Sequence, residues 1–190
     1  MSLSERLLLA RLRDRDEAAF SEIVRLYGDR VFNLVHRLVG NRSEAEDIAQ
    51  EVFVTVFKSI ETFRGEAKFS TWLLRIATNH AKNRIKYLSR RPGAGAEEAD
   101  EESLSDQPRA LQAQVAAPDA LMEAAELGSL LERAIAQLDE DQRLLMILRD
   151  VEELAYEEIC EITGLPEGTV KSRLHRARVT LKALLESHTR

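Results

Sequence analysis

The amino-acid sequence predicts an all-α protein with two helical domains joined by a flexible acidic linker. Three observations favour this class. Apolar residues recur at three- and four-residue spacing over most of the chain, which is the period of an amphipathic helix. Eight glycines and four prolines in 190 residues are too few for a strand-rich fold with many turns. Between the helical parts, residues 92–118 contain no aromatic residue and no apolar period.

Composition places the domain boundaries at this middle segment. Residues 1–91 carry a net charge of +5, residues 92–127 a net charge of −8, and residues 128–190 a net charge of −3. The middle segment is rich in Ala, Gly, Ser, Pro, Asp and Glu, a composition typical of a flexible tether. We therefore expect a domain over 1–91, a flexible acidic linker over 92–118 and a second domain over 119–190.

The first domain is expected to contain three long helices. Residues 20–38 follow one amphipathic stripe, which the Gly-Asn pair after it ends. Ser43 with Glu46 three residues later fits a capping box and opens a second helix, through residue 60. After the loop ETFRGEAKF, either Ser70 or Thr71 can cap a third helix that runs to about residue 90.

The second domain is expected to contain helices over about 119–137, 140–151, 155–163 and 167–186. In YEEICEITGLPEGTVKSRLHRAR a short helix, a Gly-Leu-Pro break and a second helix have the layout of a helix-turn-helix. On the last helix, Lys171, Ser172, His175 and Arg176 lie opposite an apolar stripe, which suits a helix in the major groove of duplex DNA. A solvated amphipathic helix explains the wheel equally well, and the preceding turn favours DNA.

The third helix of the first domain offers a different surface. From Trp72 to Arg91 the chain has six basic residues and no acidic one. The helical wheel groups Trp72 with Asn79, Asn83 and Lys86 away from the core face, with Arg75 beside them. Aromatic rings, amides and cations together suit unstacked bases. The alternative, slightly favoured by helix geometry alone, is that Trp72 only edges the core.

Three segments, in order and at the right separation, resemble one known family. SEAEDIAQEVFVTVF and FRGEAKFSTWLLRIATNHAKNRIKYLSRR look like region 2 of bacterial RNA polymerase sigma factors, and LAYEEICEITGLPEGTVKSRLHRAR looks like region 4. The likeness is to the sigma-70 family, in the extracytoplasmic-function (ECF) group and close to the sigma-E type. It implies a factor that binds core RNA polymerase, directs it to specific promoters and helps to melt the minus-ten region.

The resemblance also implies roles for individual residues. Asp47, Gln50 and Glu51 match positions that bind the clamp helices of the polymerase β′ subunit. Matches to the melting segment, to the loop that holds a flipped base and to the minus-ten reading positions are Phe63, Arg64, Lys68, Phe69, Ser70, Thr71, Trp72, Asn79, His80 and Asn83, and Arg75 and Lys86 lie beside them. Matches to the minus-thirty-five contacts are Arg149, Lys171, Ser172, His175 and Arg176, with Arg178 at their flank. His175 and Ser70 stand where the family can have an aromatic residue.

Nothing in the sequence indicates catalysis or a cofactor. One cysteine excludes an internal disulfide and a multi-cysteine zinc site, and there is no HExxH, CxxC, P-loop or nucleophile elbow. We therefore expect no catalytic residue, metal, cofactor or small-molecule substrate. No segment is apolar enough to span a bilayer and the N-terminus does not read as a signal peptide, so we expect a cytoplasmic protein without membrane insertion. The resemblance implies as partners core polymerase (β′ clamp helices and β flap), promoter DNA and an anti-sigma factor.

Two other functions remain open on the sequence. A free-standing helix-turn-helix regulator would bind duplex DNA without polymerase, and the surface around Trp72 would then have no explanation. An enzyme acting on nucleic acid would need clustered carboxylates or a nucleophile with its base, and the sequence shows neither.

Overall fold

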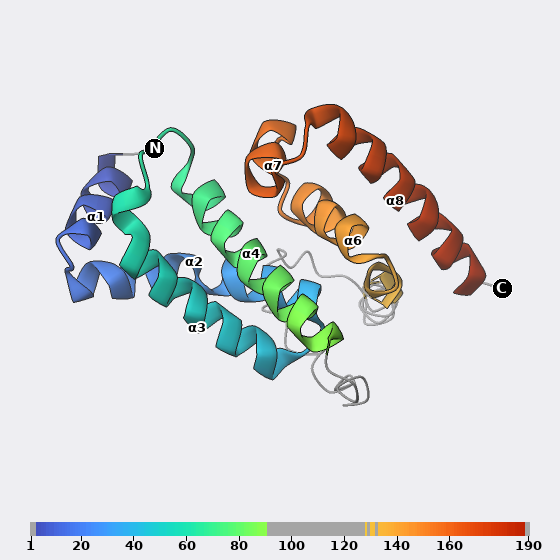
Figure 1. Cartoon of the computed structure of the whole chain (residues 1–190), viewed down its shortest axis with the longest axis horizontal. Helices are drawn as coiled ribbons and strands as arrows, with labels where there is room; N and C mark the ends of the chain where they lie inside the picture. Colours follow the sequence, from blue (N-terminus) through green and yellow to red (C-terminus); the bar gives the residue numbers. More distant parts are fainter. Residues whose placement is uncertain (1–2, 91–127, 129, 132, 189–190) are drawn as a thin grey trace, which may run out of the picture.

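In the computed structural model, the part of the chain that is described comprises residues 3–90, 128, 130–131 and 133–188. Its regular elements are all helical, so the predicted all-α class is confirmed (Figure 1). The expected linker over 92–118, and most of the helix expected over 119–137, lie outside the described residues.

The N-terminal domain is a bundle of long helices. Its elements are α1 (Leu3–Arg13), α2 (Glu17–Val39), α3 (Arg42–Ser59), the short 3-10 turn η1 (Ile60–Thr62) and α4 (Phe69–Ser89). Helices α2, α3 and α4 all pack on one another, and α1 packs on α2 and on η1. The apolar stripes predicted from the sequence face this shared interior.

The ends of α2 and α3 show where local chemistry sets the helix boundaries. Asp16 caps α2, because its Oδ1 accepts from the amide of Ala18 at 2.8 Å, and Gly40 ends the helix with a φ of +79°. Asn41 then caps α3 by accepting from the amide of Glu44 at 2.9 Å. The capping box predicted at Ser43 is wrong, since Asn41 is already extended after the left-handed Gly40 and takes the cap position first.

The start of α4 also differs from the prediction. Lys68 is the N-cap residue and gives no side-chain hydrogen bond to the helix, so a cap at Ser70 or Thr71 is wrong. Both hydroxyls lie inside the first turn, and the Thr71 hydroxyl donates instead to Glu158 of the second domain at 3.1 Å.

The C-terminal domain contains the predicted helix-turn-helix. Its main elements are α6 (Glu140–Met146), the wide π turn η3 (Ile147–Val151), α7 (Tyr156–Thr163) and α8 (Glu167–His188). Gly164 ends α7 with a φ of +71°, and Pro166 lies directly before α8. The helix expected over 140–151 is α-helical only over α6, and its last residues form the wider turn η3.

The two domains contact each other through helices that lie far apart in the sequence. Helix α7 packs on α4, and α6 packs on α2 (Figure 1). Polar contacts cross the boundary: Arg30 pairs with Glu152 at 2.6 Å, and Arg143 donates to the carbonyl oxygen of Leu38 at 3.0 Å. The sequence predicted two domains and gave no indication that they would touch.

Candidate nucleic-acid interface

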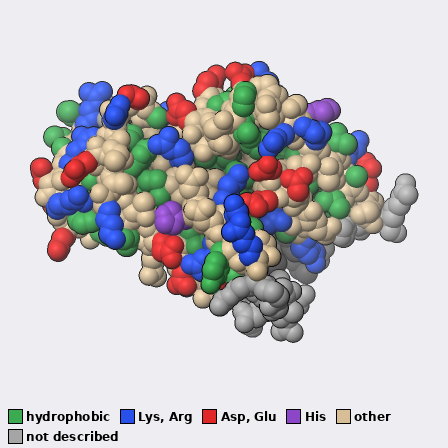
Figure 2. Space-filling view, in the orientation of Figure 1, with side chains coloured by type: hydrophobic (Ala, Val, Ile, Leu, Met, Phe, Trp, Pro, Cys, Tyr) green, Lys and Arg blue, Asp and Glu red, His purple; other side chains and the backbone are tan. Residues whose placement is uncertain are grey.

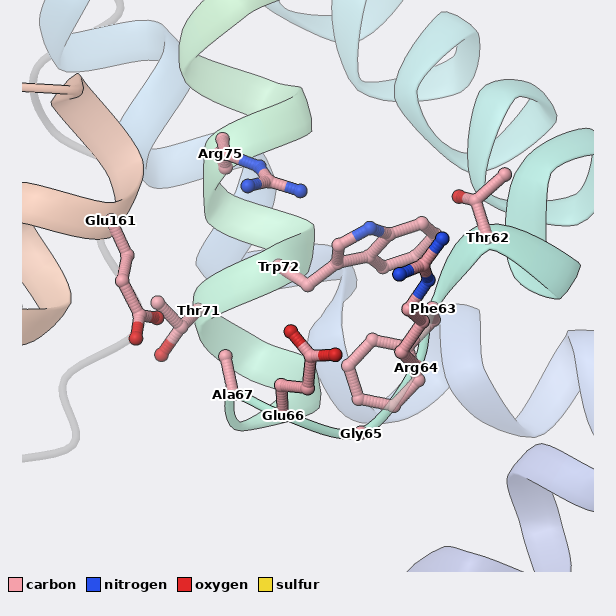
Figure 3. Close-up of a pocket in the computed structure, with 10 residues that line it drawn as sticks. All are labelled: Thr62, Phe63, Arg64, Gly65, Glu66, Ala67, Thr71, Trp72, Arg75 and Glu161. Atoms are coloured by element: carbon pink, nitrogen blue, oxygen red, sulfur yellow. The ribbon is translucent and has the colours of Figure 1, made fainter.

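A cavity of about 390 Å³ lies where the loop before α4 meets the first turns of that helix (Figure 3). Its lining comprises Thr62, Phe63, Arg64, Gly65, Glu66, Ala67, Thr71, Trp72, Arg75 and Glu161. Gly65 turns the loop with a φ of +78°, a left-handed conformation that glycine adopts without steric cost. The pocket thus brings together minus-ten residues predicted on the loop with others predicted on the helix.

Buried aromatic rings fix the shape of this pocket. Phe63, Phe69 and Trp72 are 3%, 0% and 8% exposed. The Trp72 ring centroid lies 5.4 Å from that of Phe63 and 5.8 Å from that of Phe69. Contacts between aromatic rings stabilise beyond the burial of their area. Trp72 therefore lies at the edge of the core, which is the alternative that helix geometry slightly favoured. Its ring also forms one wall of the pocket.

The end of α1 and the turn that follows it bond to the main chain next to the loop. The Nη2 atom of Arg13 donates to the carbonyl oxygen of Phe63 at 2.7 Å. Arg15, with a φ of +63°, donates to the carbonyl oxygen of Phe57 and pairs with Glu61 at 3.2 Å. Two arginines therefore fix the main chain on either side of η1.

The remaining predicted minus-ten residues differ in the solvent exposure of their side chains. Those with exposed side chains are Arg64, Lys68, Arg75, Asn79, Asn83 and Lys86, and Ser70 is half-buried. His80 lies between α3 and α4, with Nε2 3.0 Å from Oγ1 of Thr55 and Nδ1 3.4 Å from Oε2 of Glu51. Phe63, Phe69 and Thr71 are buried, so the two phenylalanines shape the pocket from within.

The residues predicted to bind polymerase lie together on α3. Asp47, Gln50 and Glu51 are exposed, opposite the fully buried Ile48 and Val52. Besides its contact with His80, Glu51 accepts from Nη2 of Arg84 on α4 at 3.2 Å. The exposed face of α3 is thus bonded to the helix that carries residues predicted to bind the minus-ten element.

The residues predicted to contact the minus-thirty-five element lie on and beside α8. Lys171, Ser172, His175 and Arg176 are exposed on the face opposite the buried Val170, Leu174 and Ala177, as the wheel predicted. A hydrogen bond from Lys171 to Glu167, 2.5 Å away, raises the pKa of the lysine ammonium.

Arg149 and Arg178, like Lys171, are held by contacts within the second domain. Arg149 is half-buried, donates to the carbonyl oxygen of Leu154 at 2.6 Å and lies over the Tyr156 ring at 4.9 Å. Arg178 pairs with Asp150 at 2.7 Å. These contacts orient the two guanidinium groups beside the exposed face of α8.

Comparisons with known proteins agree with this geometry. Residues 23–91 match the model of sigma-70 region 2, and residues 129–181 match the model of sigma-70 region 4. The ECF RNA polymerase sigma factor SigW of Bacillus subtilis is 38% identical over 181 residues, covering 93% of this chain and 94% of that protein. The chain belongs to the ECF group of RNA polymerase sigma factors. The resemblance stated from the motifs is confirmed.

One further relative supports the assignment, and one solved structure shares the fold. The ECF RNA polymerase sigma-E factor of Escherichia coli K12 is 38% identical over 176 residues, which cover 93% of this ECF sigma factor and 91% of that one. The sigma factor RpoE from Bartonella quintana, solved in complex with the anti-sigma factor NepR, has the same fold. Its TM-score is 0.63 at 24% identity, and the match covers 88% of this chain and 96% of that chain.

Some residues of the interface were not predicted for this ECF sigma factor. Glu66 lies in the loop motif, but its residue type alone indicated no role there. Glu161 lines the pocket and Arg13 bonds the main chain of its loop, both from segments far along the chain, and no local pattern marks them. Within the described part of the chain, no three His, Cys, Asp or Glu side chains are grouped to hold a metal ion, and no helix there is long and apolar enough to cross a bilayer.

Proposed function

We propose that this sigma factor binds core RNA polymerase, directs it to promoters by reading duplex DNA with α8, and melts the minus-ten region by capturing an unpaired base beside α4. Its action is binding, without a catalysed reaction, and its place is the cytoplasm. An anti-sigma factor is proposed as a further partner, because the structure of RpoE that shares this fold was solved with one.

The pocket at the N-terminal end of α4 is the observation that carries this proposal. It is concave, its lining includes the Trp72 ring and the exposed cations Arg64 and Arg75, and the exposed Lys68 lies next to it in the chain, at the start of α4. A base removed from the helical stack needs a ring or a wall to lie against, and its strand needs cations for the phosphates. Binding of the unpaired strand offsets the free energy needed to separate the base pairs.

The other two surfaces supply docking and position. The exposed carboxylates and amide of α3 provide an acidic face for a basic segment of core polymerase. The exposed Lys171, Ser172, His175 and Arg176 of α8 lie opposite its buried apolar stripe, which suits the major groove. Two DNA-binding surfaces on separate domains would set a fixed distance between duplex recognition and melting.

Permanganate footprinting tests the proposal. Promoter fragments would be treated with this chain plus sigma-free core polymerase, and with each component alone. Thymines that react only in the combined sample support promoter melting by a sigma factor. No melting in the mixture, with a duplex footprint from the chain alone, would instead favour a free-standing regulator.

A further inference from the structure

A carboxylate of the second domain is bound at the N-terminal end of α4. Oε1 of Glu158 lies 3.0 Å from Nζ of Lys68 and accepts from Oγ1 of Thr71 at 3.1 Å. Its other oxygen accepts from the amide of Ala155 at 3.0 Å, at the start of its own helix. The Glu158 side chain is only 16% exposed, so it is held in the contact between α7 and α4.

The N-terminal end of α4 has the chemistry of an anion site. The first turn contains no acidic residue, and the N-cap residue Lys68 gives no side-chain hydrogen bond to the helix. The amides of a first helical turn lack partners within the helix, and the helix dipole is positive there. Glu158 therefore places a negative charge where α4 itself provides none. A phosphate group would be bound by the same groups.

The ionisation state of the Glu158 carboxyl group agrees with binding at this end of α4. Burial alone would raise the pKa of its carboxyl group, but the hydrogen bonds from Ala155, Lys68 and Thr71 outweigh burial and lower it. The group is therefore ionised at neutral pH, and it meets Lys68 as a charged pair.

A second acidic residue of α7 lies at the pocket itself. Glu161 lines the cavity together with Thr71, Trp72 and Arg75, and its side chain extends from α7 (Figure 3). Because successive turns of a helix share a face, Glu158 and Glu161 present two negative charges to the same surface. A nucleic-acid strand carries negative charge along its whole length and cannot share that surface with them.

A further ion pair joins the two domains through α6, and the same residue of α6 also pairs with α8. Asp141 of α6 lies 3.2 Å from Nζ of Lys82 on α4 and 2.6 Å from Nη1 of Arg173 on α8. The visible face in Figure 2 shows basic and acidic side chains next to each other where the two domains meet. A competitor tethered in this way is present at a high effective concentration.

We propose that Lys68, Thr71 and the N-terminal end of α4 form a phosphate-binding site for the unpaired promoter strand, and that Glu158 occupies this site in the free chain. The inference rests on the proposed function of the pocket. Its consequence is that α7 and the unpaired strand compete, so the strand binds only after α7 leaves α4. The free chain is then held in a state that does not bind single strands, without any second protein.

Tryptophan fluorescence can measure this competition, because Trp72 is the chain's single tryptophan and lies in the pocket. The full chain would be titrated at low salt with a single-stranded DNA oligonucleotide of mixed sequence. Glu158→Gln removes the charge but keeps an oxygen for the Ala155 amide, and we expect it to bind about tenfold more tightly than the wild type. Glu161→Gln should show a smaller gain in the same direction. Both gains should shrink at high salt.

Glu157→Gln is the matched control. It removes the same charge from the adjacent, exposed position, which a helix turns away by about 100°. A gain for Glu158→Gln that Glu157→Gln does not share supports the competition. Equal affinities for the two variants would overturn it. If circular dichroism shows that Glu158→Gln disrupts α7, Glu161→Gln decides instead, since its side chain does not cap the helix.

The outcome separates this inference from the proposed function. If the wild-type chain melts promoters with core polymerase and Glu158→Gln binds strands no better than Glu157→Gln, only the competition is wrong. If the chain with core polymerase melts no promoter, the proposed function fails first.

Discussion

Replacement of Arg13 by alanine tests how the minus-ten loop is held. The Arg13 guanidinium donates at 2.7 Å to the carbonyl oxygen of Phe63, in a partly buried contact that joins α1 to the start of the loop. A hydrogen bond from a charged group contributes about 1.5–3 kcal/mol. Water can reach part of this site once the side chain is gone, so we expect Arg13→Ala to lower the free energy of unfolding by about 1–2 kcal/mol.

Arg13→Ala should also weaken promoter melting. If the loop moves, the pocket loses its preformed shape, and a loss of about 1–2 kcal/mol corresponds to roughly five- to thirtyfold weaker capture of the unpaired strand. The assay is permanganate reactivity of promoter thymines with core polymerase, alongside binding of the chain to core polymerase alone. We expect weaker melting with unchanged polymerase binding, because the face of α3 lies elsewhere.

Arg6→Ala is the control on the same helix, since Arg6 is also an exposed arginine of α1. It should leave both unfolding and melting unchanged. Arg13→Lys keeps a charged donor, although its geometry differs from that of a guanidinium group. This variant should recover part of the melting. An Arg13→Ala chain with wild-type unfolding and wild-type melting would refute the reasoning, because the loop would then hold its shape without α1.

Three other predictions follow from single residues. Phe69→Ala removes a ring that is 0% exposed and should lower the free energy of unfolding by about 3–5 kcal/mol, measured by urea denaturation with Trp72 fluorescence as the probe. Arg176→Ala should weaken binding of the holoenzyme to duplex minus-thirty-five DNA by about 1–3 kcal/mol in a gel-shift assay while leaving binding to a premelted minus-ten fragment unchanged, a split that a folding defect would not produce. The lowered pKa of Glu158 predicts that its contribution to domain contact is present above the ordinary carboxyl pKa and lost as pH falls through the lowered value. Energy transfer between dyes on the two domains should therefore fall in acid for the wild type, and a Glu158→Gln chain should lack that transition.

Local patterns predicted those features of the fold that depend on nearby residues. The apolar stripe of α8 determines which side chains face outward, so the exposed set around Lys171 and Arg176 was predictable from the helical period alone. Gly164 marked the turn of the helix-turn-helix because a left-handed residue ends α7. At the start of α3, the capping-box pattern indicated Ser43 as the cap, although Asn41 takes the position.

Local sequence patterns could not predict contacts between residues that lie far apart in the chain. Thr71 and Glu158 are 87 residues apart, and Arg13 and Phe63 are 50 apart. Neither pair has a period or motif that connects its members. Trp72 was ambiguous for a related reason: a wheel assigns a residue one face, whereas this ring packs against Phe63 of the loop as well as against the core.

The separation between Thr71 and Glu158 also sets an order of events on the ribosome. The contacts within the first domain join neighbouring helices, and such local contacts form early and quickly. Domains fold from the N-terminal end as the chain emerges. The first domain, with every lining residue of the pocket except Glu161, is therefore complete before α7 is synthesised. Each newly synthesised chain passes through an interval in which the pocket is uncovered, and that interval ends when residue 158 leaves the exit tunnel and α7 folds.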